Sequence, residues 1–226
     1  MWAVLPAKNI VDAKQRLAEA LRPAQRRTLF RLMYENALSV LSSARGLDGI
    51  AVVTCDPAAA EIAESFGARL ITEPANDGQT AAVERAAKTL AAEGARGILT
   101  IPGDTPLISA AEVERVLDAH GDPPAMTIVP AHDRRGSNCI AVSPPDLIPF
   151  SFGNDSFQPH LAAARERGVE PRVLPLPGLG LDIDTPEDLR ALLRRPEANP
   201  VCDFLNDSGI AERFLADREQ ALEDVS

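Results

Sequence analysis

Strand-like and helix-like patterns alternate along most of this chain, and that alternation restricts the folds open to it. Short apolar runs with β-forming residues are separated by amphipathic stretches with helical spacing. The expected strands are Trp2 to Pro6, Gly49 to Cys55, Arg69 to Thr72, Gly97 to Ile101, Ala125 to Val129, Asn138 to Val142 and Arg172 to Leu176. The expected helices are Pro23 to Ser43, Pro57 to Phe66, Gln79 to Ala92, Ser109 to Ala119, Phe157 to Arg167 and Pro186 to Leu193. Repeated βα units predict an α/β fold of three layers, with a mostly parallel sheet between helices.

The pattern changes after Arg195, where no further strand is indicated. A chain of 226 residues with 45% hydrophobic residues can form one α/β domain, which we assign to residues 1–195. Residues 196–226 are polar and acidic, with one helical pattern around Ile210 to Leu222. We expect a C-terminal helical arm that packs on the domain or on a partner subunit, which leaves a homodimer open.

Three aspartates stand where a parallel sheet places ligand-binding side chains. Asp104 follows the buried run Gly97 to Ile101, and the carboxyl ends of parallel strands line the ligand crevice of open α/β sheets. Asp182 and Asp184 alternate with apolar residues, so on an extended segment both point to one side. Carboxylates gathered in this way predict a Mg²⁺ site.

A helix start is the alternative explanation for the second acidic stretch. Thr185 can cap a helix, Pro186 suits its first position, and Asp188 stands where a capping-box acid would. That pattern explains the stretch from Thr185 onward. It leaves Asp182 and Asp184 unexplained, because they precede the cap.

Composition excludes several classes of partner and location. The formal charge of −10 argues against a general nucleic-acid or anionic-membrane surface, which needs clustered cations. The cysteines, Cys55, Cys139 and Cys202, form no CxxC pair, which fits a reducing cytoplasm. Cys55 and Cys139 lie in apolar runs and are expected to be buried. The sequence runs from Met1 directly into a strand pattern and has no membrane-length apolar stretch, which predicts a cytoplasmic protein.

A basic loop after the first expected strand is the candidate for binding an anionic ligand. The chain has no GxxxxGK[ST] loop, and its Gly178-Leu179-Gly180 lacks the third glycine of a dinucleotide fingerprint. Lys8, Lys14 and Arg16 instead gather on the loop at the same rim of the sheet as Asp104. Solvated surface charge remains the alternative.

A second candidate anion site is the start of the expected helix at Phe157. Ser156 can cap that helix, Pro159 is tolerated in its first turn, and free N–H groups there can receive a phosphate. A capping serine without a ligand is the alternative. His160 lies one turn inside the helix, where either a structural or a catalytic histidine is consistent with the pattern.

In their order along the chain these motifs resemble a known family. The Pro6-Ala7-Lys8 loop, Ala13-Lys14-Gln15-Arg16-Leu17, Gly103-Asp104-Thr105-Pro106-Leu107 and Asp182-Ile183-Asp184-Thr185-Pro186-Glu187-Asp188-Leu189 resemble nucleotidyltransferases of the glycosyltransferase-A-like fold. Gly136-Ser137-Asn138 and the segment from Phe152 to His160 bring the chain closer to the guanylyltransferases that activate 2-phospho-L-lactate or phosphoenolpyruvate for coenzyme F(420). The resemblance extends over residues 1–193.

The resemblance implies a nucleotide-diphospho-sugar-transferase-like, Rossmann-like fold and a division of labour among the candidates. Lys8, Lys14, Arg16 and Asp104 would act on the triphosphate of GTP, and Asp104, Asp182 and Asp184 would hold Mg²⁺. A small phospho-carboxylate would be seated by Gly136, Ser137, Asn138, Gly153 and Ser156. Two departures affect selectivity: Ser137 replaces the usual threonine, and Gly78-Gln79-Thr80 replaces a segment associated with base and ribose recognition.

The resulting hypothesis is transfer of GMP from GTP to phosphoenolpyruvate, 2-phospho-L-lactate or 3-phosphoglycerate, with phosphoenolpyruvate favoured and pyrophosphate released. The acceptor phosphate is already ionised, so the reaction needs alignment and charge neutralisation rather than a general base. Cytidylyl or molybdopterin guanylyl transfer on the same scaffold, and a non-catalytic nucleotide-binding protein, remain the alternatives.

Overall fold

The computed structural model describes residues 1–7, 9–10, 13–153, 155–195 and 197–215. Its strands are β1 (Trp2–Pro6), β2 (Gly49–Thr54), β3 (Arg69–Thr72), β4 (Ile98–Thr100), β5 (Ala125–Pro130), β6 (Ser137–Ser143) and β7 (Arg172–Val173). Its helices are η1 (Gln15–Leu17), α1 (Pro23–Ser43), α2 (Pro57–Ser65), α3 (Gln79–Ala92), α4 (Ala110–Ala119), α5 (Phe157–Glu166), α6 (Pro186–Leu193) and α7 (Pro200–Asp207). Residues 210–215 are also helical.

One seven-stranded sheet in the order β3-β2-β1-β4-β6-β5-β7 organises the molecule. β1 pairs in parallel with β2 and β4, β2 with β3, and β5 with β7. β6 is antiparallel to both of its neighbours, β4 and β5. Because β6 runs the other way, its first residues lie at the same rim as the carboxyl ends of the parallel strands.

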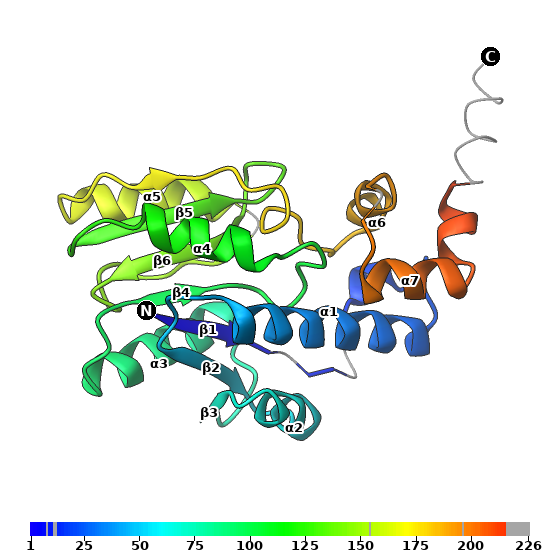
Figure 1. Cartoon of the computed structure of the whole chain (residues 1–226), viewed down its shortest axis with the longest axis horizontal. Coiled ribbons are helices and arrows are strands. Elements are labelled where there is room, and N and C mark those ends of the chain that lie inside the picture. Colours follow the sequence, from blue (N-terminus) through cyan, green and yellow to red (C-terminus); the bar gives the residue numbers. More distant parts are fainter. Residues whose placement is uncertain (8, 11–12, 154, 196, 216–226) are drawn as a thin grey trace, which may run out of the picture.

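Helices cover both faces of the sheet, which confirms the three-layer arrangement (Figure 1). Successive residues of β1 alternate between the two layers: Leu5 packs with α1, α2 and α4, whereas Val4 packs with α3 and α5. A third apolar cluster joins the first half of α1 to α6 and α7, beyond the end of the sheet. No helix in the described residues has the length and apolar character to cross a membrane.

Most expected elements agree with the structure to within a residue or two, and the differences are informative. β4 spans only Ile98–Thr100, and β7 ends at Val173. α7 was not expected, although Asn199 caps it by accepting from the N–H groups of Val201 and Cys202. Cys55 is exposed, contrary to the expectation that it is buried, because β2 ends at Thr54.

Candidate active site

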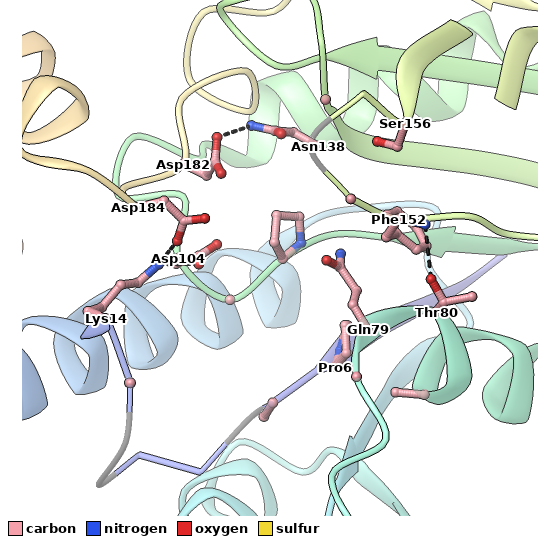
Figure 2. Close-up of a pocket in the computed structure, with 18 of the residues that line it drawn as sticks. Pro6, Lys14, Gln79, Thr80, Asp104, Asn138, Phe152, Ser156, Asp182 and Asp184 are labelled. Carbon is pink, nitrogen blue, oxygen red and sulfur yellow. Dashed lines mark hydrogen bonds and ion pairs between the residues drawn. The ribbon is translucent and has the colours of Figure 1, made fainter. Parts of the chain in front are cut away.

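A cavity of about 1130 Å³ lies at the rim where the parallel strands end and β6 begins. Its wall includes every described residue of the expected site: Lys14, Arg16, Asp104, Gly136, Ser137, Asn138, Gly153, Ser156, Asp182 and Asp184. Lys8 lies outside the described residues. The tertiary structure therefore brings together segments that are far apart in the sequence, as Figure 2 shows.

The acidic corner of this cavity is built by two loops that hydrogen-bond to each other. The N–H of Ile183 donates to the carbonyl oxygen of Asp104 at 3.1 Å. Leu181 and Ile183 are fully buried, while the alternating residues Asp182 and Asp184 line the cavity. The extended geometry expected from the Asp-Ile-Asp stretch thus places both carboxylates on the cavity side.

Lys14 inserts its ammonium group between two of these carboxylates. Its Nζ donates to Oδ2 of Asp104 and, at 2.9 Å, to Oδ1 of Asp184. Burial alone lowers the pKa of Lys14, but the charges of Asp104 and Asp184 outweigh it and raise the pKa above the ordinary value. Arg16 is more exposed, and its Nη1 lies 3.7 Å from Oδ2 of Asp184.

Asp182 is held differently from the other two acids. Nδ2 of Asn138 donates to its Oδ1 at 3.0 Å, as Figure 2 shows. Burial, followed by the nearby charge of Asp104, raises the pKa of Asp182 to about 6, against the lowering effect of Asn138. Asn138, which is expected to seat the acceptor, lines the cavity and also connects β6 to the acidic corner.

The acidic corner as it stands is a lysine–carboxylate cluster. Among the described residues, no three Asp, Glu, His or Cys side chains are arranged to enclose a metal ion. Even so, Oδ1 of Asp104 is buried without a hydrogen-bond partner. A buried carboxylate oxygen without a donor and a neighbouring acid with a raised pKa are both features that a bound cation would relieve.

A second corner, next to the acidic one, is formed by the start of β6 and the segment leading into α5. The N–H of Ser137 donates to Oγ of Ser156 at 3.0 Å. Ser156 stands at the N-cap position of α5, but its side chain makes no capping hydrogen bond. The expected cap is therefore wrong, because the hydroxyl is used by β6, and the N–H of Phe157 donates to the carbonyl of Arg135.

His160 supports this corner from below the surface. It is fully buried, the N–H of Ser151 donates to its Nε2 at 3.0 Å, and its Nδ1 lies 3.0 Å from Oγ of Ser137. Since Nε2 accepts, Nδ1 carries the proton and donates to Ser137. Burial lowers the pKa of His160 to about 4, so the imidazole is neutral near pH 7.

Three contributors to the site were not predicted from the sequence. Oδ2 of Asp188 accepts from the N–H of Asp184 at 3.0 Å, so the capping acid also positions the acidic corner. Oγ1 of Thr80 accepts from the N–H of Phe152 at 3.0 Å, which joins α3 to the segment before α5 (Figure 2). Glu73 directly follows the carboxyl end of β3 and lines the cavity. An acidic residue at the carboxyl end of an expected strand was the signal that could have identified it.

Comparison with known proteins points to one family. The model of a family described as "Guanylyl transferase CofC like" matches residues 1–222. A phosphoenolpyruvate guanylyltransferase of Conexibacter woesei is 37% identical over 195 residues, covering 84% of this chain and 86% of that protein. A 3-phospho-D-glycerate guanylyltransferase of Colwellia psychrerythraea is 35% identical over 204 residues, covering 88% of this chain and 96% of that protein.

The fold also resembles that of a solved structure. A crystal structure described as a nucleotide-diphospho-sugar transferase from Desulfovibrio desulfuricans G20 superposes with a TM-score of 0.75. It is 19% identical and covers 94% of this chain and 97% of that one. At this identity the likeness concerns the fold alone, and it confirms the expected sheet architecture.

Proposed function

Because this chain belongs to the CofC-like guanylyl transferase family, we propose that it transfers GMP from GTP to the phosphate of a three-carbon phospho-carboxylate, with phosphoenolpyruvate as the preferred acceptor. An acceptor phosphate oxygen attacks the α-phosphorus of GTP. The bond from that phosphorus to the bridging oxygen breaks, and pyrophosphate leaves. The product is a guanylylated acceptor of the kind used in coenzyme F(420) biosynthesis.

The observation that carries this proposal is the meeting of two differently built corners in one cavity. The acidic and lysine-containing corner suits a triphosphate and its cation, and the corner of Ser137 and Ser156 presents hydroxyl and backbone groups. Asn138 connects the two corners through Asp182. Two substrates bound in such adjoining corners would have their reacting phosphates side by side, which is most of what this reaction requires.

The donor set of the acidic corner fits Mg²⁺. Carboxylate oxygens are the ligands that this ion prefers, and Asp104, Asp182 and Asp184 would hold it. The partnerless Oδ1 of Asp104 supports this assignment. When bound, Mg²⁺ neutralises charge on the triphosphate oxygens.

The remaining basic groups act on the triphosphate. Lys14 is buried at the acidic corner and keeps its proton, so it supplies a fixed positive charge to the leaving pyrophosphate. Arg16 is more exposed than Lys14, and its guanidinium group can bind the same phosphates. Lys8, on the same loop, is proposed to join them. No side chain has to remove a proton, since the attacking phosphate is already ionised.

The acceptor is proposed to lie against Gly136, Ser137, Asn138, Gly153 and Ser156. His160 donates to Oγ of Ser137, which leaves the hydroxyl proton of Ser137 available for a phosphate or carboxylate oxygen. A smaller side chain than threonine at this position widens the corner by one methyl group. Pyrophosphate release measured with GTP and each of the three acceptors identifies the preferred one, and a preference for CTP over GTP would contradict guanylyl transfer.

The metal assignment is tested by Asp182→Asn and, separately, Asp184→Asn. Each change removes a negative charge while retaining a similar shape, so pyrophosphate release should fall by about a hundredfold or more. Asp146→Asn, at an exposed site away from the cavity, is the matched control and should turn over normally. Near-normal release by both cavity variants would overturn the assignment.

A further inference from the structure

Glu73 is a buried carboxylate in the cavity wall that none of the proposed steps uses. It follows β3, and its backbone N–H donates to the carbonyl of Thr54. The residue is only 5% exposed and still lines the cavity. Among the described residues, none donates a hydrogen bond to its carboxylate and none forms an ion pair with it. Its carboxylate oxygens are not sealed from water, so they open onto the polar cavity and can accept hydrogen bonds from a ligand.

The charges around Glu73 do not offset the burial of its carboxylate. Burial raises the pKa of Glu73, Asp77 adds to the rise, and Arg85 opposes it. Arg85 acts at longer range than an ion pair, and its own Nε is buried without a partner. A ligand that donates hydrogen bonds to Glu73 would therefore compensate for its burial.

The place of Glu73 in the sheet indicates which part of GTP reaches it. β3 lies three strands from β4, whose end leads to Asp104. At a strand spacing of about 4.8 Å, the two strand ends are roughly 14 Å apart. If the phosphates lie at the corner of Asp104 and Lys14, as proposed above, the base is the part of the nucleotide that can reach β2 and β3, because it is farthest from the β and γ phosphates.

Guanine offers this carboxylate two adjacent donors. We propose that the two carboxylate oxygens of Glu73 accept hydrogen bonds from N1–H and the 2-amino group of guanine, and that this pairing selects GTP. Adenine presents an acceptor at N1, which a carboxylate repels, and uracil offers a single donor. The inference rests on the guanylyl transfer proposed above and names the residue that makes the donor nucleotide GTP.

Wild-type protein gives the first test through inosine triphosphate, which lacks only the 2-amino group. Loss of one hydrogen bond to a buried carboxylate should lower kcat/KM about tenfold to a hundredfold relative to GTP. The effect should appear in KM for the nucleotide, with KM for the acceptor unchanged. Equal use of the two nucleotides would overturn the proposal without any variant being made.

Glu73→Gln gives the second test, because it predicts a switch rather than a loss. The amide offers one acceptor and one donor, which match N1–H and the 2-oxo group of xanthine. The variant should lose about a hundredfold in kcat/KM with GTP and prefer xanthosine triphosphate. Asp77→Asn, which changes the other carboxylate near this end of the cavity, is the control and should retain the preference for GTP.

The outcomes separate this inference from the proposed function. Wild-type protein that releases no pyrophosphate from GTP with any acceptor contradicts guanylyl transfer itself. Wild-type turnover with GTP, combined with a Glu73→Gln variant that weakens GTP, inosine and xanthosine triphosphates equally, contradicts only the base contact and indicates a ribose or structural role. If Glu73→Gln does not fold, the comparison of GTP with inosine triphosphate in wild-type protein still tests whether the 2-amino group of guanine is recognised. A switch that occurs in Asp77→Asn would assign the contact to Asp77.

Discussion

At the scale of single residues, His160 shows how a histidine beside a reactive site can be structural. The Phe150 and Phe152 rings lie around it, with centroids 6.3 and 5.0 Å from that of the imidazole. Both ring nitrogens are engaged, one by the N–H of Ser151 and the other by Ser137. The neutral ring therefore holds the hydroxyl of Ser137 in place and does not exchange protons with it.

This burial predicts a pH dependence of stability. The folded-state pKa of about 4 lies below the ordinary value of 6.5, so on acidification the unfolded chain binds a proton before the folded protein does. The stabilisation is complete above pH 6.5 and is lost as the pH falls from about 6.5 to 4. Its full size is about 3 kcal/mol.

The contribution of His160 to the unfolding free energy can be measured by urea unfolding of wild type and His160→Gln at several pH values. The difference in unfolding free energy between the two proteins should shrink as the pH is lowered through this range. The comparison must be made against the variant, because Asp182 has a raised pKa and contributes with the opposite sign over part of the same range. A difference that stays constant with pH would contradict the buried neutral ring.

At the scale of secondary-structure elements, α6 combines a cap with the placement of the acidic corner. Oγ1 of Thr185 accepts from the N–H of Asp188, and Oδ2 of Asp188 accepts from the N–H groups of Thr185 and Asp184. The two explanations of this stretch are compatible in the structure. The helix start from Thr185 onward fixes the backbone that carries Asp184.

Thr185→Ala should reduce the unfolding free energy by about 1 kcal/mol, because the first turn of α6 loses its capping oxygen. If Asp184 holds Mg²⁺ as proposed, the change should also raise the concentration of Mg²⁺ needed for half-maximal turnover, since Asp184 loses part of its support. Thr185→Ser retains the hydroxyl and should behave like wild type in both measurements. Equal stability of the alanine and serine variants in chemical denaturation would rule out the cap as a significant contribution.

At the scale of the whole molecule, the described part of the C-terminal region forms part of the same folded body. Val201, Leu205 and Phe214 share an apolar cluster with Leu29 and Met33 of α1. α6 contributes to this cluster as well. The helices after residue 196 therefore cover a side of α1 that would otherwise face water (Figure 1).

Leu205→Ala tests the contribution of this cluster. The side chain is fully buried, so its truncation should lower the unfolding free energy by about 3 kcal/mol. Leu215 is 51% exposed, and Leu215→Ala should change stability by less than about 0.5 kcal/mol. Urea denaturation of both variants makes the comparison. A small effect at Leu205 would indicate that residues 197–215 add little to the stability of the rest.

The amino-acid sequence by itself determined the alternation of helices and strands, the α/β class and the positions of the aspartates at the end of a strand and along an extended segment. These depend on patterns within a few residues: the periods of 2 and 3.6, capping residues and the point where an apolar run ends. α1, α3 and α6 begin and end where the sequence predicts. α7 was missed because it is only eight residues long and lies in a region whose overall composition is polar and acidic, although Asn199-Pro200 marked its start.

Only the tertiary structure decided how these pieces meet. It placed antiparallel β6 between β4 and β5, inserted Lys14 between acids 90 and 170 residues away, and used the hydroxyl of Ser156 for β6 instead of α5. It also exposed Cys55 and brought Glu73 into the wall of the cavity. Such contacts depend on the order of strands and the packing of layers, which join distant segments and leave no local pattern in the sequence.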